Sequence, residues 1–344
     1  MKREFIDSVR QDLQMYAGRA DTKARKIERY ITDLAIKIED LNKNSSKEDI
    51  SIEKMDAEYS LNKDDFGNEL FIKTDNVGNG QMICLASGCQ RVPLSPEMKR
   101  QLRLYESLTP IYLQIIDELE YVDEIWLFET KFNVALARCE NDVGNYIMPG
   151  LDGKLLYDFG LTFYDWFEFI DKQNNPNRKA LWSPMAFIEM YHQLIMHMKA
   201  PVYENRYSDK EEMIGITTAH LNLDWLMADT IEKSAVKMMI VKDDSTLIGM
   251  NSQAKNDIQL EVHDASKYSS LNPIDPELMQ KKKQFVFETL NLEHEKSDEV
   301  CSFASRVKSE FQFEHSLFGK SYTIVREKAP EMGFNFVALL DNVE

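Results

Sequence analysis

The first forty or so residues carry apolar side chains at steps of three and four positions. These residues are Phe5, Val9, Leu13, Tyr16, Ala20, Ala24, Ile27, Ile31, Leu34, Ile38 and Leu41. Such steps place side chains on one face of an α-helix, so the pattern predicts a single helix from Glu4 to about Asn44, with Gly18 its only weak point. At 1.5 Å per residue this helix is about 60 Å long. A stripe of that length is either covered by the rest of the chain or shared with a second copy in a homodimer, and the sequence leaves both arrangements open.

Two stretches near the middle of the chain alternate with the period of a β-strand. Every second residue of 194–202 is apolar, and residues 214–220 alternate in the same way. The polar segment 204–212 between them has the composition of a loop. A hairpin that is symmetric about the centre of this loop places His197 directly opposite His220, with both side chains on one face. A slip of one residue would separate them, so this prediction depends on the register.

The rest of the chain divides into a larger and a smaller module. Residues 236–344 contain, in order, two strands around a turn, helical stretches and three final strands, which is the order of PAS-like domains. Residues 45–235 follow the same order at larger size and include a polar, turn-rich insertion at 45–93. With the helix of residues 1–44, this predicts an α+β protein in which a long N-terminal helix is followed by two PAS-like antiparallel-sheet modules.

Composition narrows the choice of partners and of compartment. The chain has 344 residues and a net charge of −17, which argues against nucleic acid and against anionic membrane surfaces as partners. No apolar run approaches the roughly 18 residues that a membrane span needs, and no signal peptide is recognisable. Four cysteines are too few for a disulfide framework. Cys84 and Cys89 are close enough for a small loop disulfide, and they fit equally well as two thiols.

Three short segments resemble a known family, and they occur in the family's order. They are Trp166-Phe167, Trp182-Ser183-Pro184-Met185 and Ala200-Pro201-Val202-Tyr203. The family is that of the double Cache (dCache) sensor domains of bacterial and archaeal receptors. The resemblance implies a membrane-distal Cache module at 45–235 and a membrane-proximal one at 236–344. It also implies an extracytoplasmic, ligand-sensing domain of a cell-membrane receptor, such as a histidine kinase or chemoreceptor, whose membrane helices flank this chain.

The resemblance also assigns a ligand pocket in the distal module. The matching positions here are Tyr164, Trp166, Phe167, Trp182, Ala186, Ile188, His197 and His220. Amino-acid-binding members have an Arg where Tyr164 stands, and their Asp that holds the ligand's ammonium group falls on His220. Both clamps are missing, so the ligand implied is a small carboxylate or other anion, or a neutral molecule, rather than an α-amino acid. From the residues alone, the aromatic positions are typical of an ordinary core.

The sequence contains none of the common catalytic motifs. There is no nucleophile elbow, no zinc-protease motif and no phosphate-binding loop. The prediction is therefore a sensor chain without turnover and without a cofactor, although the output domain it serves can be an enzyme. Two alternatives stay open. One is a metal-dependent enzyme that uses His197 and His220 as ligands, with Glu189 as a third. The other is a structural module whose distal cavity is filled by side chains.

Overall fold

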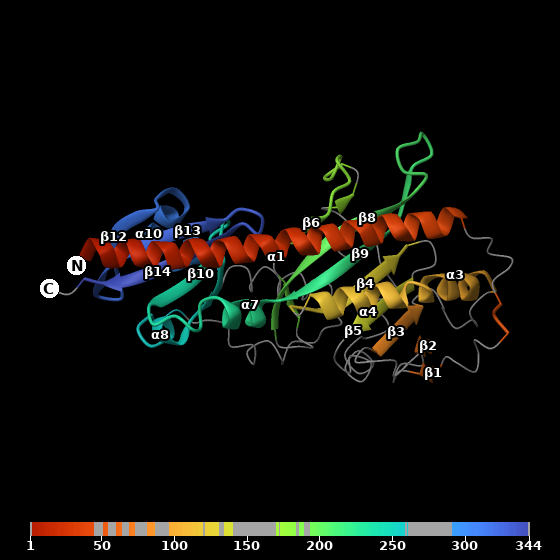
Figure 1. Cartoon of the computed structure of the whole chain (residues 1–344), viewed down its shortest axis with the longest axis horizontal. Helices are drawn as coiled ribbons and strands as arrows, with labels where there is room; N and C mark the ends of the chain where they lie inside the picture. The colour runs from red at the N-terminus through yellow and green to blue at the C-terminus, as the bar shows by residue number, and fades with distance from the viewer. Residues whose placement is uncertain are drawn as a thin grey trace. The chain divides into compact units, whose positions relative to one another are not determined.

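The structure is a computed structural model of the chain (Figure 1). It describes residues 2–44, 51–53, 60–63, 69–72, 81–86, 96–119, 121–130, 134–139, 170–171, 173–183, 186–188, 193–258, 260 and 291–342. The chain divides into two compact units. Unit 1 comprises residues 1–26, 186–194 and 223–344, and unit 2 comprises residues 27–185 and 195–222. Cys84 lies in a strand whose side chains are not described, and Cys89 lies outside the described residues, so the disulfide prediction stays open.

Helix α1 (Lys2–Asn44) is the long helix that the apolar periodicity predicts. Its buried stripe consists of Val9, Leu13, Ala17, Ala20, Ala24, Ile27, Ile31, Leu34, Ala35 and Ile38. Phe5, which the sequence assigns to this stripe, is instead 52% exposed. The residues up to Lys26 belong to unit 1 and those from Ile27 belong to unit 2. Among the described helices, none combines the length and the hydrophobicity of a membrane span.

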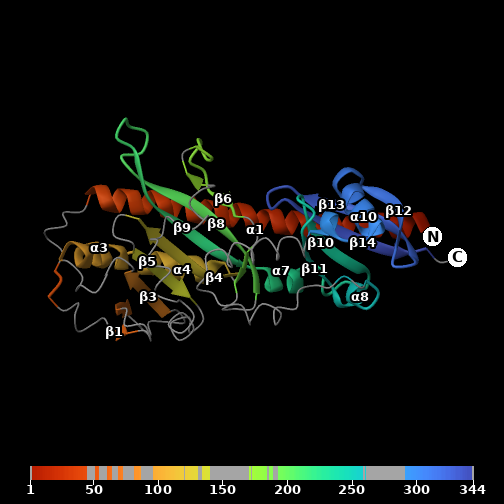
Figure 2. The same cartoon turned by 180° about the vertical axis from the view of Figure 1, so that it is seen from behind.

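Unit 2 is built on an antiparallel sheet. Its strands follow the order β3 (Gln81–Ala86), β5 (Val134–Cys139), β4 (Val122–Glu129), β9 (Glu212–Asn222), β8 (Gln193–Glu204) and β6 (Leu181–Trp182). A separate pair is formed by β1 (Ser60–Lys63) and β2 (Glu69–Ile72), while β7 (Ala186–Ile188) is a short strand. Figures 1 and 2, drawn from opposite sides, show α1 and α4 (Thr109–Glu118) on the same face of the sheet.

Polar contacts tie α1 to the helices beside it in unit 2. The hydroxyl of Tyr30 donates a hydrogen bond to the Glu118 carboxylate of α4. The side-chain amide of Gln101, in α3 (Pro96–Glu106), donates to Oδ1 of Asn42 at 2.7 Å. Asn42 in turn donates to the Tyr105 hydroxyl at 3.3 Å. These bonds join the last turns of α1 to the helix layer of unit 2.

The β8–β9 hairpin has the register that the alternation predicts at the histidines. His197 is the Cα partner of His220, and the pairing continues unchanged to Val202 opposite Gly215. Only glycine fits at position 215, because a Cβ there would lie 2.4 Å from the backbone oxygen of Phe128. Beyond this point the register shifts by one residue, so that Tyr203 faces Met213. A β-bulge therefore separates the tip of the hairpin from the histidine region.

Unit 1 is built on a second antiparallel sheet. Its strands follow the order β11 (Leu247–Met250), β10 (Lys237–Lys242), β14 (Phe334–Asp341), β13 (Lys320–Ala329) and β12 (Gln312–Leu317). The described helices are α7 (Leu223–Asp229), α8 (Ser252–Lys255), the short 3-10 helix η5 (Leu292–His294) and α10 (Asp298–Ser309). Helix α10 starts after Ser297, because the Ser297 side chain accepts a hydrogen bond from the Val300 N–H and caps its N-terminus.

The core of unit 1 lies between one face of this sheet and helix α10. Its apolar side chains come from the strands and from helices α8, η5 and α10. They are Met239, Val241, Leu247, Met250, Ala254, Ile258, Leu292, Val300, Phe303, Ala304, Val307, Phe313, Leu317, Tyr322, Ile324, Val337 and Leu339. Because these side chains pack against one another, this face of the sheet is filled by protein.

The two sheets share one strand order. Five strands correspond: the order β5-β4-β9-β8-β6 of unit 2 matches the order β11-β10-β14-β13-β12 of unit 1, while the unit 2 sheet also contains β3 at its edge and β7 beside β8. The α+β fold with two antiparallel modules after a long helix is thus confirmed. The sequence places the module boundary at residue 236, whereas the compact units change at Leu223. Helix α7 consequently groups with the second sheet.

Candidate functional site

His197 and His220 lie on the face of the unit 2 sheet that points away from the helices. Side chains alternate along β4, and Glu129 points toward Tyr105 of α3. Burial and, next, the charge of Glu129 raise the pKa of that tyrosine. Glu124 has the opposite parity and is the Cα partner of His220, which is itself the partner of His197. These three residues therefore form one row across β4, β9 and β8 on the other face, which we call the histidine face.

The two imidazole rings of this row stack on each other. Their centroids are 4.4 Å apart and their planes differ by 9°. Burial lowers the pKa of His197 well below its usual value, and the charges of His220 and Lys199 lower it further. His197 still retains some accessible surface. Its ring is therefore neutral at physiological pH.

Glu124 fixes the orientation of His220. Its Oε2 lies 2.9 Å from Nδ1 of His220 and accepts a hydrogen bond from the indole N–H of Trp126, also at 2.9 Å. Glu124 and His220 are each only 3% exposed. A carboxylate at Nδ1 makes that nitrogen the protonated one and turns Nε2 away from Glu124. The row thus contains a buried carboxyl group that the sequence did not predict beside the histidines.

A second row crosses the same face two residues further along the strands. Lys199 is the Cα partner of Thr218, and Thr218 is the partner of Trp126. Lys199 is 3% exposed and Thr218 is 1% exposed. The hydroxyl of Thr218 is buried and has no hydrogen-bond partner. Burying an ammonium group and an unsatisfied hydroxyl is unfavourable, by about 1–3 kcal/mol for the hydroxyl alone. The histidine face is therefore not built as an ordinary core.

The structure brings together only part of the predicted pocket. His197 and His220 are neighbours as expected. Trp182 is the partner of Met198, whose position in β8 alternates with that of His197, so Trp182 points to the opposite face of the sheet. Ala186 and Ile188 lie in β7, where side chains are not described. The predicted residues Tyr164, Trp166 and Phe167 lie outside the described part of the chain, as does Glu189.

Three residues of the candidate site were not predicted from the sequence: Glu124, Lys199 and Thr218. Lys199 and Thr218 carry a signal in hindsight, because each interrupts a strand at the parity of the histidines. Glu124 carries no such signal, since its place depends on the pairing of β4 with β9 across almost a hundred residues. Within the described residues, no group of three or more His, Cys, Asp or Glu side chains is arranged to hold a metal ion.

We compared the chain with protein families, curated proteins and solved structures. No protein-family model matches the chain, and no curated protein matches it. Among solved structures, the extracellular domain of the histidine kinase soHK1S-Z6 is 14% identical, with a TM-score of 0.51 over 99% of this chain and 95% of that one. The sensory domain of the Campylobacter jejuni chemoreceptor CcmL is 9% identical, with a TM-score of 0.48 over 99% and 96%.

The chain has the fold of the soHK1S-Z6 extracellular domain. This conclusion rests on the likeness to the histidine kinase domain, which covers nearly all of both chains. It confirms the architecture expected from the double Cache resemblance, in which two antiparallel-sheet modules follow one long helix. A further similar structure is the ligand-binding domain of the Pseudomonas aeruginosa chemoreceptor PctB, solved with L-Arg, at 12% identity and a TM-score of 0.40 over 69% of this chain and 78% of that one.

Proposed function

We propose that this chain is the extracytoplasmic ligand-sensing domain of a transmembrane signalling receptor, and that it binds a small molecule on the histidine face of unit 2. One contrast carries the proposal. The two sheets have the same strand order, yet the face of the unit 1 sheet is filled by an apolar core. The histidine face instead buries polar side chains, namely those of Lys199, Glu124, Thr218 and His220.

Such a collection of buried polar groups is typical of a binding site. A stable core with the same strands needs none of these groups, as unit 1 demonstrates. We therefore assign ligand binding to unit 2 and assign to unit 1 the role of passing the change toward the membrane. No reaction is proposed for the chain itself. Glu124 and His220 form a carboxylate–imidazole pair, but none of the described hydrogen bonds joins a nucleophilic side chain to that imidazole.

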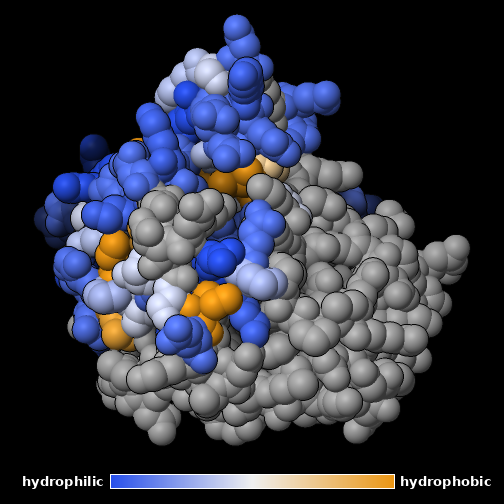
Figure 3. Space-filling view, turned by 90° about the vertical axis from the view of Figure 1, so that its right-hand side faces the viewer, coloured by the Kyte–Doolittle hydropathy of each residue, from blue (hydrophilic) through white to orange (hydrophobic). Residues whose placement is uncertain are grey.

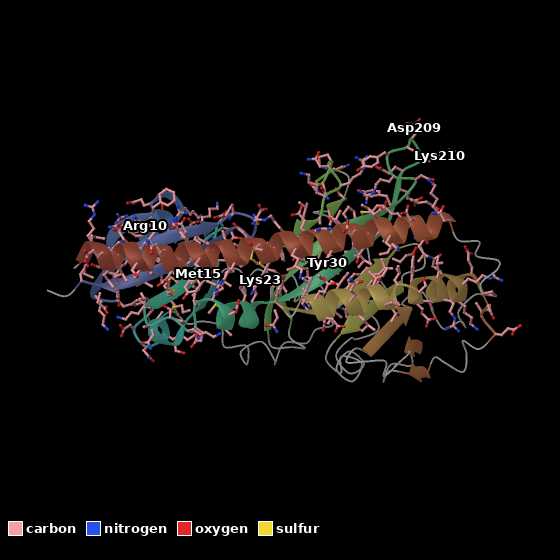
Figure 4. All side chains as sticks on the ribbon, viewed as in Figure 1. Arg10, Met15, Lys23, Tyr30, Asp209 and Lys210 are labelled. Atoms are coloured by element: carbon pink, nitrogen blue, oxygen red, sulfur yellow. The ribbon has the colours of Figure 1, made fainter. Side chains whose placement is uncertain are left out.

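Helix α1 is proposed to form a homodimer contact. Met15 and Ile36 are exposed apolar residues on this helix, at 42% and 45%, and a Cβ at Gly18 would meet no atom within 4 Å. Met15 is labelled on α1 in Figure 4. A small residue beside an exposed apolar one allows a second helix to approach closely. Sedimentation velocity at increasing concentration tests this arrangement, and a monomer at all concentrations contradicts it.

Native mass spectrometry of the purified chain tests the ligand proposal. The expected result is a bound small molecule, or binding of one from a metabolite library, that is lost in His220→Ala and kept in Lys210→Ala. Lys210 is a suitable control because it lies at the tip of the β8–β9 hairpin (Figure 4). The surface at this end of the hairpin is hydrophilic (Figure 3). Stoichiometric zinc or iron that is lost in His197→Ala, together with hydrolysis, would instead establish the metal-enzyme alternative.

A further inference from the structure

The tip of the β8–β9 hairpin, residues 204–212, presents a tyrosine to solvent in an uncommon backbone conformation. Tyr207 is 73% exposed, more than any other large apolar side chain among the described residues. Its φ of 63° lies in the left-handed region, which bulky residues rarely adopt. The Glu211 carboxylate accepts a hydrogen bond from the Tyr207 N–H at 2.6 Å and so holds this conformation. Strained backbone that is held in place occurs mainly where a residue has a function.

A neighbouring loop and α1 keep this tyrosine in position. Arg178, from the loop that precedes β6, donates to the Glu211 carboxylate at 2.6 Å, and the two side chains are 17% and 1% exposed. The guanidinium carbons of Arg178 and Arg206 lie 5.0 and 5.9 Å from the centroid of the Tyr207 ring. Arg206 is itself bonded to Glu39 of α1. The tip is therefore ordered before any partner binds, which lowers the entropic cost of association.

The tip and Lys37 lie on opposite edges of α1. In Figures 1 and 2 the tip projects past α1, on the side of the helix away from α4. Glu39, which bonds the tip, lies on this edge. The other edge borders α4, where the Tyr30 hydroxyl bonds Glu118. Lys37 is seven residues after Tyr30 and so lies on that same edge. Between the two edges the helix exposes Ile36, at 45%.

The tip and the exposed face of α1 differ in charge. Three of the four exposed ionisable residues of the tip are acidic, the four being Glu204, Asp209, Lys210 and Glu212. Glu204 and Glu212 are direct Cα partners across the hairpin, and like charges at such positions are destabilising. Over residues 36–44, in contrast, α1 exposes two lysines and one aspartate. Among the described residues, no carboxylate pairs with Lys37. The two surfaces are therefore complementary in charge.

We propose that the tip packs against the Lys37 edge of α1 in a second copy of the chain, with Tyr207 as its anchor. This inference rests on the receptor function and the α1 homodimer proposed above. Two receptor copies in one membrane are related by a two-fold axis along their parallel helices. When the exposed faces of the two helices meet about this axis, the tip edge of each lies beside the Lys37 edge of the other. The contact therefore occurs twice in the dimer.

Sedimentation equilibrium at low ionic strength tests the contact through the dissociation constant of the dimer. Lys37→Glu is expected to weaken the dimer about tenfold or more, because repulsion replaces attraction in both contacts. Reversal of the tip charges, in Asp209→Lys with Glu212→Lys, is expected to have a similar effect. Combined with Lys37→Glu, this reversal is expected to restore the affinity to within about threefold. Tyr207→Ala is expected to weaken the dimer about tenfold, as for an aromatic anchor.

The control is Lys296→Glu, which reverses the charge of an exposed lysine in unit 1 and is expected to leave the dimer unchanged. All the substituted side chains are exposed, so the circular dichroism of every variant is expected to match the wild type. Unchanged affinity in Lys37→Glu, or weakening that the combined charge reversal does not restore, overturns the pairing of the tip with Lys37. Unchanged affinity in Tyr207→Ala overturns the anchor.

These outcomes are distinct from those that decide the proposed function. A dimer that none of the tip variants weakens overturns the tip contact and leaves the pairing of α1 in place. A wild type that stays monomeric at all concentrations overturns both the tip contact and the α1 dimer. Ligand sensing is decided separately by the native mass spectrum, which does not depend on the oligomeric state.

Discussion

The last turns of α1 are fastened to the β8–β9 hairpin through a single carboxylate, that of Glu39. Arg206 donates to it three times, from Nε at 2.9 and 2.7 Å and from Nη2 at 2.5 Å. The backbone N–H of Tyr203 donates to the same carboxylate at 2.8 Å. Tyr203 is the residue at which the register of β8 shifts. One N–H of β8 therefore bonds the helix where the register shifts, and Arg206 completes the contact.

The size of this interaction follows from its burial. The side chains of Arg206 and Glu39 are 16% and 13% exposed. Burial alone would lower the pKa of Arg206, but the hydrogen bonds and the charge of Glu39 raise it overall. Fully exposed pairs contribute about 0–1 kcal/mol, and breaking a fully buried pair costs about 3–5 kcal/mol. For a pair with this exposure and a bidentate guanidinium, we expect a coupling free energy of about 2 kcal/mol, between those limits.

A double-mutant cycle measures the coupling. Urea unfolding of the wild type, Glu39→Gln, Arg206→Met and the double variant gives the four free energies. Gln keeps the shape of Glu39, and Met keeps the aliphatic stem of Arg206. The control cycle uses Arg29 and Asp33, which lie on the same helix 3.8 Å apart but are 83% and 66% exposed. That pair is expected to give about 0.5 kcal/mol or less.

Hydrogen exchange supplies a second measurement on the same variants. The Tyr203 amide donates to Glu39, so Glu39→Gln is expected to accelerate its exchange more than that of Val202. A coupling for Glu39–Arg206 no larger than that of the exposed control pair would refute the reasoning. So would unchanged protection at Tyr203, because the amide would then depend on another acceptor.

Three further outcomes follow from buried polar groups. The pKa of His197 is lowered in the folded state, so the unfolded chain binds more protons below about pH 6.5. The free energy of unfolding, measured by urea titration, is therefore expected to fall as the pH drops from 7 to 5. His197→Phe is expected to reduce this dependence on pH. Tyr112 is fully buried with an unpaired hydroxyl, so Tyr112→Phe is expected to change the free energy of unfolding by less than about 1 kcal/mol, and a larger loss contradicts this. Asn251→Ala is expected to cost about 3 kcal/mol in the same assay, because its side chain bonds the N–H groups of Met238 and Ala254 and the carbonyl of Val236.

The parts of the fold that were predictable depend on local periodicity. Helix α1 follows from apolar steps of three and four, since helical contacts join residues close in sequence. The pairing of His197 with His220 was predicted from a loop taken as symmetric, and it is correct. The pairs at the tip differ from that register by one residue, because the β-bulge lies between Val202 and Tyr203. At this bulge the Tyr203 N–H donates to Glu39, on a helix far away in the sequence, and no local pattern reveals that contact.

The composition of the candidate site was predictable only where both residues belong to one hairpin. Glu124 reaches His220 through the pairing of β4 with β9, and Trp182 is placed on the other face by its pairing with Met198. Both depend on the register between strands far apart in sequence. A register is fixed by which face is buried, and a shift of one residue reverses every side chain. The resemblance to a family supplied positions for the pocket, but not the face on which each side chain emerges.

The two units share a strand order, but equivalent faces of their sheets bear different side chains, and this contrast bears on function. Unit 1 shows that the fold is completed by apolar side chains on the equivalent face, including Phe303 from α10 and Val337 from β14. The histidine face of unit 2 instead buries Lys199, His220 and Glu124, and buried ionisable groups stabilise a fold less than apolar side chains of the same volume. A small molecule that binds this face, as proposed above, stabilises the bound state over the free one. Binding and the stability of unit 2 are thus linked, and a sensor requires that linkage to turn occupancy into a structural change.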